Sequence, residues 1–144
     1  MCGILGYSKQ KVNNNINDKF IDYGINLLKN RGPDDDGFFY NLDRSIGLAH
    51  TRLSILDLSK LGHQPMFSSD ERYVLVYNGE IYNFKELRSD LVKHFSFKSN
   101  SDSEVILYSY IHYGNSFLEK LNGIFALAIY DRKEDQLIIA RDRF

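Results

Sequence analysis

The sequence contains few of the residues that mark disulfide-rich, metal-binding or membrane proteins. Its 144 residues include one cysteine, no tryptophan and two prolines, and no apolar run approaches the ~20 residues of a membrane span. A single cysteine excludes an internal disulfide and a cysteine-rich zinc site. A reducing compartment fits best, so we expect a cytoplasmic protein. With a formal net charge of −1, neither nucleic acid nor a membrane surface is an expected partner.

The residues that are present indicate a folded domain. Apolar residues make up 43% and charged residues 26%, close to globular averages, and aromatic residues reach 14%, which favours a strand-rich fold over disorder. The length suits one domain with its own core. The patterns run as strands, a helix, strands, two helices and strands. This order predicts an α/β or α+β sandwich in which helices cover packed sheets.

Residue spacing gives approximate bounds for these elements. Apolar residues at helical spacing predict helices over 14–28, 83–95 and 101–114, with Asn14, Asn15 or Asn17 capping the first, Asn83 the second, and a Ser101–Glu104 capping box the third. A further short helix is expected over 115–122. The expected strands are 2–8, 38–41, 45–56, 73–78 and a hairpin from 123 with its turn at 132–136. Segment 31–37 reads as a turn and 57–71 as a long loop.

The only cysteine directly follows the initiator methionine. A lone free cysteine most often behaves as a small buried apolar side chain. Removal of Met1, which a small second residue allows, gives Cys2 a free α-amine beside its thiol. Their reference pKa values, about 7.7–8.0 and about 8.5, both lie near neutrality. A nucleophile and a base on one residue are the arrangement of N-terminal nucleophile enzymes, so Cys2 is our candidate nucleophile.

Polar residues at three other places have no obvious use in a core. Arg52, in the stretch HTRLSI, either reaches water from an edge strand or clamps a carboxylate with its planar fork. Asn78–Gly79 forms either a tight hairpin turn or an oxyanion hole. Asp102 either supplies charge at a helix start or binds a substrate ammonium group.

Together with Cys2, these positions supply a nucleophile, an oxyanion pair, a cation and an anion. A substrate with an α-carboxylate, an α-amine and a side-chain carbonyl satisfies every one of them, and glutamine is such a molecule. Spacing alone leaves open whether the groups converge.

Several segments, taken in order, carry a family resemblance. They are CGILGY, RGPDDDG, AHTRLSILDLS, GHQPM, VYNGEIYNFKELR, SDSEVIL, LNGIFALAIYD and ARDRF. Over essentially the whole chain they resemble the glutaminase domain of class II glutamine amidotransferases. RGPD with NGEIYNFKELR resembles the asparagine synthetase (glutamine-hydrolysing) branch. The resemblance implies the α+β fold of Ntn hydrolases, a four-layer αββα sandwich of two antiparallel sheets flanked by helices, and L-glutamine as substrate.

The resemblance also implies catalytic roles. Cys2 matches the catalytic N-terminal cysteine, and Asn78 and Gly79 match the oxyanion hole. The mechanism that it implies needs no metal. No histidine is implicated, and no histidine pair has convincing metal-ligand spacing.

Substrate-binding roles follow by the same resemblance. Arg52 matches the clamp for the glutamine carboxylate, and Leu53 and Ile55 match the neighbouring pocket wall. Glu80 matches a contact to the glutamine amine, and Asp102 matches its ammonium anchor.

The asparagine synthetase branch also implies a second domain. In that branch a C-terminal domain activates aspartate with ATP and Mg²⁺ and receives the ammonia. Its SGGxDS-type motif is absent here, as are the Walker and dinucleotide-binding motifs. We therefore expect 1–144 to be a type 2 glutamine amidotransferase domain, cut from a longer chain at about Phe144 and without a cofactor of its own. The synthetase domain is its expected partner, and a homodimer is compatible with the resemblance.

Other functions stay open at this point. The parent synthetase could amidate a carboxylate other than aspartate. A non-catalytic interaction module would retain Met1, but it gives Arg52 no purpose. An Ntn hydrolase acting on a different amide would leave Arg52 and Asp102 without partners on the substrate.

Overall fold

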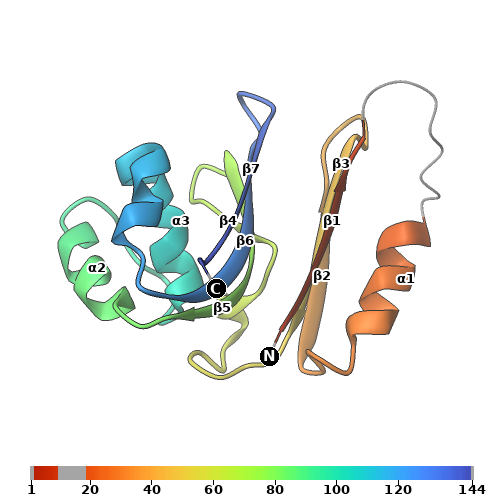
Figure 1. Cartoon of the computed structure of the whole chain (residues 1–144), viewed down its shortest axis with the longest axis horizontal. Coiled ribbons are helices and arrows are strands. Elements are labelled where there is room, and N and C mark those ends of the chain that lie inside the picture. Colours follow the sequence, from red (N-terminus) through yellow and green to blue (C-terminus); the bar gives the residue numbers. More distant parts are fainter. Residues whose placement is uncertain (1, 10–18, 144) are drawn as a thin grey trace.

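The computed structural model describes residues 2–9 and 19–143. Two antiparallel sheets face each other, and helices cover their outer sides (Figure 1). Helix α1 (Lys19–Leu28) lies outside the first sheet, whereas α2 (Phe84–Leu91), α3 (Asp102–Tyr113) and the 3-10 helix η2 (Gly114–Lys120) lie outside the second. This order of layers confirms the four-layer αββα sandwich expected from the sequence.

The first sheet has the order β1-β3-β2. It comprises β1 (Gly3–Ser8), β2 (Asp35–Tyr40) and β3 (Ile46–Arg52), and every residue of β3 is buried. Gly3 pairs with Thr51, so the start of β1 lies beside the end of β3. The predicted strand 45–56 is too long, because β3 pairs with β1 only as far as Thr51 and with β2 only as far as Arg52. Strand β2 begins at Asp35, earlier than predicted, because the acidic run pairs with β3.

The second sheet has the order β4-β5-β6-β7. Its strands are β4 (Met66–Phe67), β5 (Tyr73–Ile81), β6 (Gly123–Asp131) and β7 (Gln136–Arg141), and the predicted loop 57–71 also contains the 3-10 helix η1 (Lys60–Gly62). Strand β5 continues through Asn78–Gly79, where Gly79 pairs with Phe125, so the hairpin-turn alternative is wrong. Pairing with β6 overrides the local turn preference. A Cβ at Gly79 would lie 2.2 Å from the Ile124 carbonyl oxygen, which explains the glycine.

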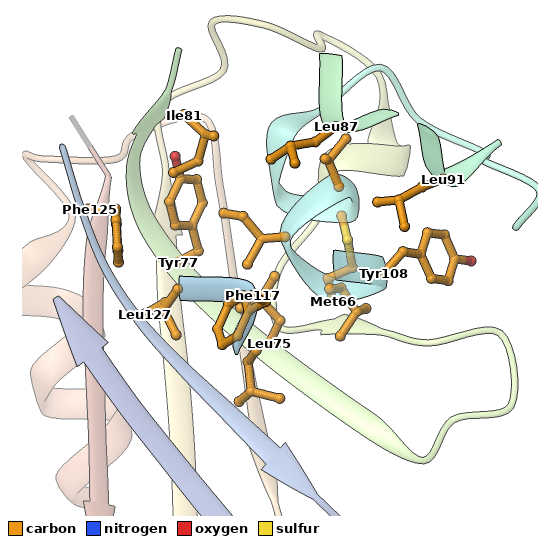
Figure 2. Packing of buried hydrophobic residues seen from close by; sticks show 14 residues of the cluster. Met66, Leu75, Tyr77, Ile81, Leu87, Leu91, Tyr108, Phe117, Phe125 and Leu127 are labelled. Atoms are coloured by element: carbon orange, nitrogen blue, oxygen red, sulfur yellow. The ribbon is translucent and has the colours of Figure 1, made fainter. Parts of the chain in front are cut away.

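The larger hydrophobic core lies between the second sheet and its helices (Figure 2). Side chains from β5, β6, α2, α3 and η2 meet there, among them Leu75, Leu127, Leu87, Ile106 and Phe117. A smaller cluster between the sheets includes Leu48, Val76 and Tyr130. Helix α1 buries less apolar surface against the first sheet, because Ile21 is the one buried residue among residues 19–28.

The helix predictions are confirmed in type and corrected in detail. The expected start of the first helix, with its asparagine caps, lies outside the described residues. Helix α2 ends at Leu91 rather than 95, and Asn83 makes no side-chain cap bond; its amide contacts Lys120 and Asn122 instead. Ser101 caps α3, but the predicted capping box is only half formed, because the Glu104 carboxylate accepts from Lys98 and Ser99 rather than from the Ser101 N–H. No helix within residues 2–9 and 19–143 has the length and apolar character to cross a membrane.

Candidate active site

A cavity of about 520 Å³ is lined by residues of both sheets. The first sheet contributes the start of β1, the end of β3 and the loop after it. The second contributes the end of β5, the start of β6 and the beginning of α3. The cavity brings together every residue of the site predicted from the sequence: Cys2, Arg52, Leu53, Ile55, Asn78, Gly79, Glu80 and Asp102.

Main-chain groups hold Cys2 at the cavity. Its Sγ accepts a hydrogen bond from the Leu53 N–H at 3.3 Å and lies 3.7 Å from the Leu53 carbonyl oxygen. The Arg31 Nε–H donates to the Cys2 carbonyl oxygen at 3.3 Å. The thiol is half-buried, so it is fixed in place yet open to a molecule in the cavity.

Arg52 is 8% exposed, so the water-facing alternative is wrong. Its guanidinium donates to the Ser59 carbonyl oxygen at 2.8 Å and to the Asp57 carbonyl oxygen. A Cβ at Gly62 would meet Nη2 at 2.2 Å, so a larger residue there would displace the guanidinium from its present position. Arg52 forms no ion pair within the described residues. A buried guanidinium bound only by carbonyl groups retains its full charge toward the cavity.

The turn segment RGPDDDG supports the Arg52 backbone. The Asp34 N–H donates to the Arg52 carbonyl oxygen at 3.0 Å, and Asp34 Oδ2 accepts from the Ser54 N–H at 2.8 Å. A Cβ at Gly32 would lie 2.4 Å from the Arg52 nitrogen. The segment therefore fixes the chain on both sides of the arginine.

The Gly79 N–H points away from β6, toward the cavity. The partner of Gly79 on β6 is Phe125. The Phe125 N–H donates to Asp142 Oδ2 at 2.8 Å, and the Phe125 carbonyl oxygen accepts from the Asp142 N–H, also at 2.8 Å. Gly79 and Phe125 are thus a non-hydrogen-bonded pair, and the Gly79 N–H points away from β6. The N–H groups of Tyr77 and Ile81 point the same way and donate to Gln64 and Asp102. Between these two occupied donors, the Gly79 N–H is available to a ligand oxygen.

Asn78 lies on the opposite face of β5 from Tyr77 and Ile81. Val74 and Val76 pack in the core between the sheets, and alternate residues of a strand share a face. Asn78 therefore lies on the face that looks toward the first sheet, which carries Cys2. Asn78 and Cys2 thus line the same cavity from opposite sheets.

Asp102 is 5% exposed at the start of α3. Its Oδ2 accepts hydrogen bonds from the Tyr77 hydroxyl at 2.7 Å and the Ile81 N–H at 3.1 Å. Burial raises the pKa of the Asp102 carboxyl, and these hydrogen bonds act against that rise. No described residue forms an ion pair with Asp102. The cavity thus presents a buried carboxylate as well as a buried guanidinium.

The remaining predicted residues lie nearer the opening. Leu53 is half-buried, Glu80 is exposed, and Ile55 is 71% exposed. Ile55 therefore forms the rim of the cavity rather than a buried wall.

Sequence reasoning missed Tyr77 and Gln64, which are both buried and both line the cavity. Tyr77 looked like one more apolar strand residue, and Gln64 fell in a predicted loop. The Gln64 amide accepts from the Tyr77 N–H at 2.6 Å and donates to Ser103 Oγ at 3.2 Å. The only signal in the sequence was the tyrosine directly before Asn78.

Comparison with known protein families decides the membership of this chain. The profile of the glutamine amidotransferase domain family matches residues 1–144. The chain belongs to this family. Its relatives include amidase chry2 of Gibberella zeae, 37% identical over all of this chain and 23% of the relative, and glutamine-hydrolysing asparagine synthetase 1 of Bacillus subtilis, 39% identical with the same shares covered. The chain thus spans about a quarter of the length of these curated relatives.

A solved amidotransferase shares the fold. Glutamine phosphoribosylpyrophosphate amidotransferase from B. subtilis superposes with a TM-score of 0.72 at 21% identity, over 98% of this chain and 36% of that one. At this identity the similarity establishes the architecture. It agrees with the Ntn-hydrolase sandwich that the sequence predicted.

Proposed function

We propose that this chain hydrolyses the side-chain amide of L-glutamine to glutamate and ammonia, with Cys2 as the nucleophile. The observation that carries the proposal is the pair of buried, opposite charges in the cavity that contains the only thiol. Burying a charge without a partner is costly. A ligand with an α-carboxylate and an α-ammonium group supplies the partners for Arg52 and Asp102. Membership of the glutamine amidotransferase domain family supports the same substrate.

The first half of the reaction forms a thioester. With Met1 removed, the α-amine of Cys2 takes the thiol proton, directly or through a water molecule, and the thiolate adds to the amide carbon. The oxyanion accepts hydrogen bonds from the Asn78 side chain and the Gly79 N–H, and one such donor typically contributes about 10²–10³ in rate. The protonated amine then gives its proton to the departing ammonia. The product is a γ-glutamyl thioester on Cys2.

The second half of the reaction releases glutamate. The free α-amine takes a proton from water as the water oxygen adds to the thioester carbon. Collapse of this intermediate breaks the carbon–sulfur bond, and the amine returns the proton to the thiolate. The α-amine therefore accepts and returns one proton in each half of the reaction.

We further propose that the ammonia passes to a synthetase domain of the parent protein, which uses ATP and Mg²⁺ to amidate aspartate. The asparagine synthetases among the relatives support this acceptor, and their greater length accommodates such a domain. A fungal relative named as an amidase motivates testing other acceptors. The full-length protein, supplied with glutamine, ATP, Mg²⁺ and a panel of carboxylates, should form asparagine. If the protein amidates another carboxylate and not aspartate, that carboxylate is the acceptor and the aspartate part of the proposal is wrong.

The glutaminase proposal is tested by the intact mass of the full-length protein before and after treatment with 6-diazo-5-oxo-L-norleucine. We expect loss of Met1 and one covalent adduct, which is absent in Cys2→Ala. Retention of Met1 without an adduct would support a non-catalytic module. Turnover of other amides but not of glutamine would support a different Ntn hydrolase.

A further inference from the structure

We infer that the Tyr77 hydroxyl positions the Asp102 carboxylate for the α-ammonium group of the substrate, which makes Tyr77 a determinant of glutamine affinity. The inference rests on the proposed function. Tyr77 is 3% exposed and packs in the larger core. A phenylalanine would fill the same apolar space, so packing alone does not account for the hydroxyl. That hydroxyl donates to Asp102 Oδ2 at 2.7 Å.

Strand β5 and the start of α3 together orient the Asp102 carboxylate. The two donors on β5, the Tyr77 hydroxyl and the Ile81 N–H, end on Oδ2. The main-chain N–H groups of Ser103 and Asp102 also hydrogen-bond the carboxylate, from the start of α3. In Figure 2 the Tyr77 ring lies beside Ile81, with its hydroxyl directed toward that residue. The donors from β5 and α3 thus fix the rotation of the carboxylate.

The hydroxyl also favours the charged form of Asp102. Burial raises the pKa of Asp102, and the hydrogen bond from Tyr77 is the first contribution that lowers it. Burial and the Asp102 charge raise the pKa of Tyr77, so the hydroxyl keeps its proton and acts as a donor. An ionised, oriented carboxylate is the partner that an ammonium group needs.

A second set of hydrogen bonds, through Gln64, fixes the position of Tyr77 relative to Asp102. Gln64 binds the Tyr77 N–H through Oε1 and Ser103 Oγ through Nε2. Because Ser103 directly follows Asp102, Gln64 ties the backbone of Tyr77 to the first turn of α3. The strand and the helix therefore meet through two separate contacts.

The test compares Tyr77→Phe with Tyr130→Phe in the full-length protein. Tyr130 is a matched control, because its hydroxyl also donates to an aspartate, Asp135, at 2.7 Å, away from the cavity. The substrates are L-glutamine and glutaramate, which is glutamine without the α-amine. We expect Tyr77→Phe to raise KM for glutamine about tenfold with little change in kcat, a loss in the range of one hydrogen bond to a charged group. The kcat/KM of glutaramate, or its inhibition constant, should not change in Tyr77→Phe. Tyr130→Phe should leave the kinetic constants for both substrates unchanged.

Two further variants separate positioning from a general structural role. Because Tyr77 acts through Asp102, Tyr77→Phe should weaken glutamine binding no further when it is added to Asp102→Asn. Replacement of Tyr77 by 4-aminophenylalanine keeps the volume and a donor, so it should recover most of the affinity, and it provides the test if Tyr77→Phe fails to fold.

The outcomes separate this inference from the proposed function. Equal losses for both substrates, or an unchanged KM for glutamine, would overturn the positioning role while leaving the glutaminase proposal intact. A wild-type protein that neither hydrolyses glutamine nor takes the diazo adduct would overturn both.

Discussion

The two sheets contribute to the site in different ways. The first sheet supplies Cys2 and Arg52 from strand ends, where main-chain groups hold them, and its outer helix buries little. The second supplies Asn78, Gly79 and Asp102 from a continuous strand and a buried helix start, backed by the larger core. The proposed oxyanion donors and the proposed ammonium anchor are therefore built on the well-packed half. The proposed nucleophile and carboxylate clamp are held instead by individual hydrogen bonds to main-chain groups.

The largest expected effect tests the packing difference itself. Phe117 is 0% exposed in the larger core, whereas Phe38 on β2 is 56% exposed. Phe117→Ala should lower the free energy of unfolding by about 3–5 kcal/mol, because it removes buried surface and leaves a cavity. The matched substitution Phe38→Ala should change it by less than about 0.5 kcal/mol. Urea denaturation of both variants measures the contrast, and similar losses would contradict it.

The next effect tests the proposed oxyanion role of Asn78 on the second sheet. Asn78→Ala should lower kcat for glutamine about 10²–10³-fold with a small change in KM, since an oxyanion donor acts mainly in the transition state. Asn122→Ala provides the control, because Asn122 is exposed, directly precedes β6 and does not line the cavity. A rise in KM without a loss of kcat would assign Asn78 to substrate binding instead.

The sequence predicted which residues line the cavity better than it predicted the ends of the strands around it. Local patterns located the strands and helices because burial imposes their periodicity. Two boundaries failed for a common reason. The strand from 45 stops at Arg52 because its partners end there, and β5 runs past Asn78–Gly79 because β6 continues beside it. Both depend on pairing between distant segments, which local preference does not contain.

The convergence of the site also lies beyond local patterns. Cys2 and Arg52 come together through the β1–β3 register, whereas Asp102 reaches the cavity because α3 packs against β5. The family resemblance indicated these positions, but it gave no reason for Tyr77 or Gln64. Their roles rest on hydrogen bonds between residues 13 or more positions apart.

The interface between the sheets gives the third prediction, through His50 on β3. The side chain is buried, and neither ring nitrogen makes a hydrogen bond of ordinary geometry to a described residue. Interaction with the Tyr77 backbone favours the charged form of His50 but does not offset the effect of burial. Burial lowers the pKa of His50 from 6.5 to about 4. Between these values the unfolded chain binds the proton and the native chain does not, so stability falls as the pH drops from about 6.5 to 4. The full loss from this residue is about 3 kcal/mol.

Substitution of His50 tests this pH dependence. His50→Leu removes the titrating group, so the free energy of unfolding should fall less steeply between pH 6.5 and 4 than in the wild-type protein. Urea denaturation at several pH values measures both slopes. Parallel slopes would show that His50 does not titrate differently in the two states.

The smallest expected effect is the loss of a helix cap, compared between α3, which packs on the second sheet, and the 3-10 helix η1 after β3. Ser101 Oγ accepts from the Glu104 N–H at 3.4 Å and caps α3, whereas Ser59 Oγ accepts from the Leu61 N–H at 3.1 Å in the exposed loop after β3. Ser101→Ala should cost about 1 kcal/mol of stability, and Ser59→Ala less than about 0.5 kcal/mol. The Glu104 carboxylate binds the N–H groups of Lys98 and Ser99 rather than that of Ser101, so it still holds the start of α3 in the variant. Ser101→Ala should therefore lower the unfolding midpoint in urea while leaving KM for glutamine unchanged, and a raised KM would show that the cap itself positions Asp102.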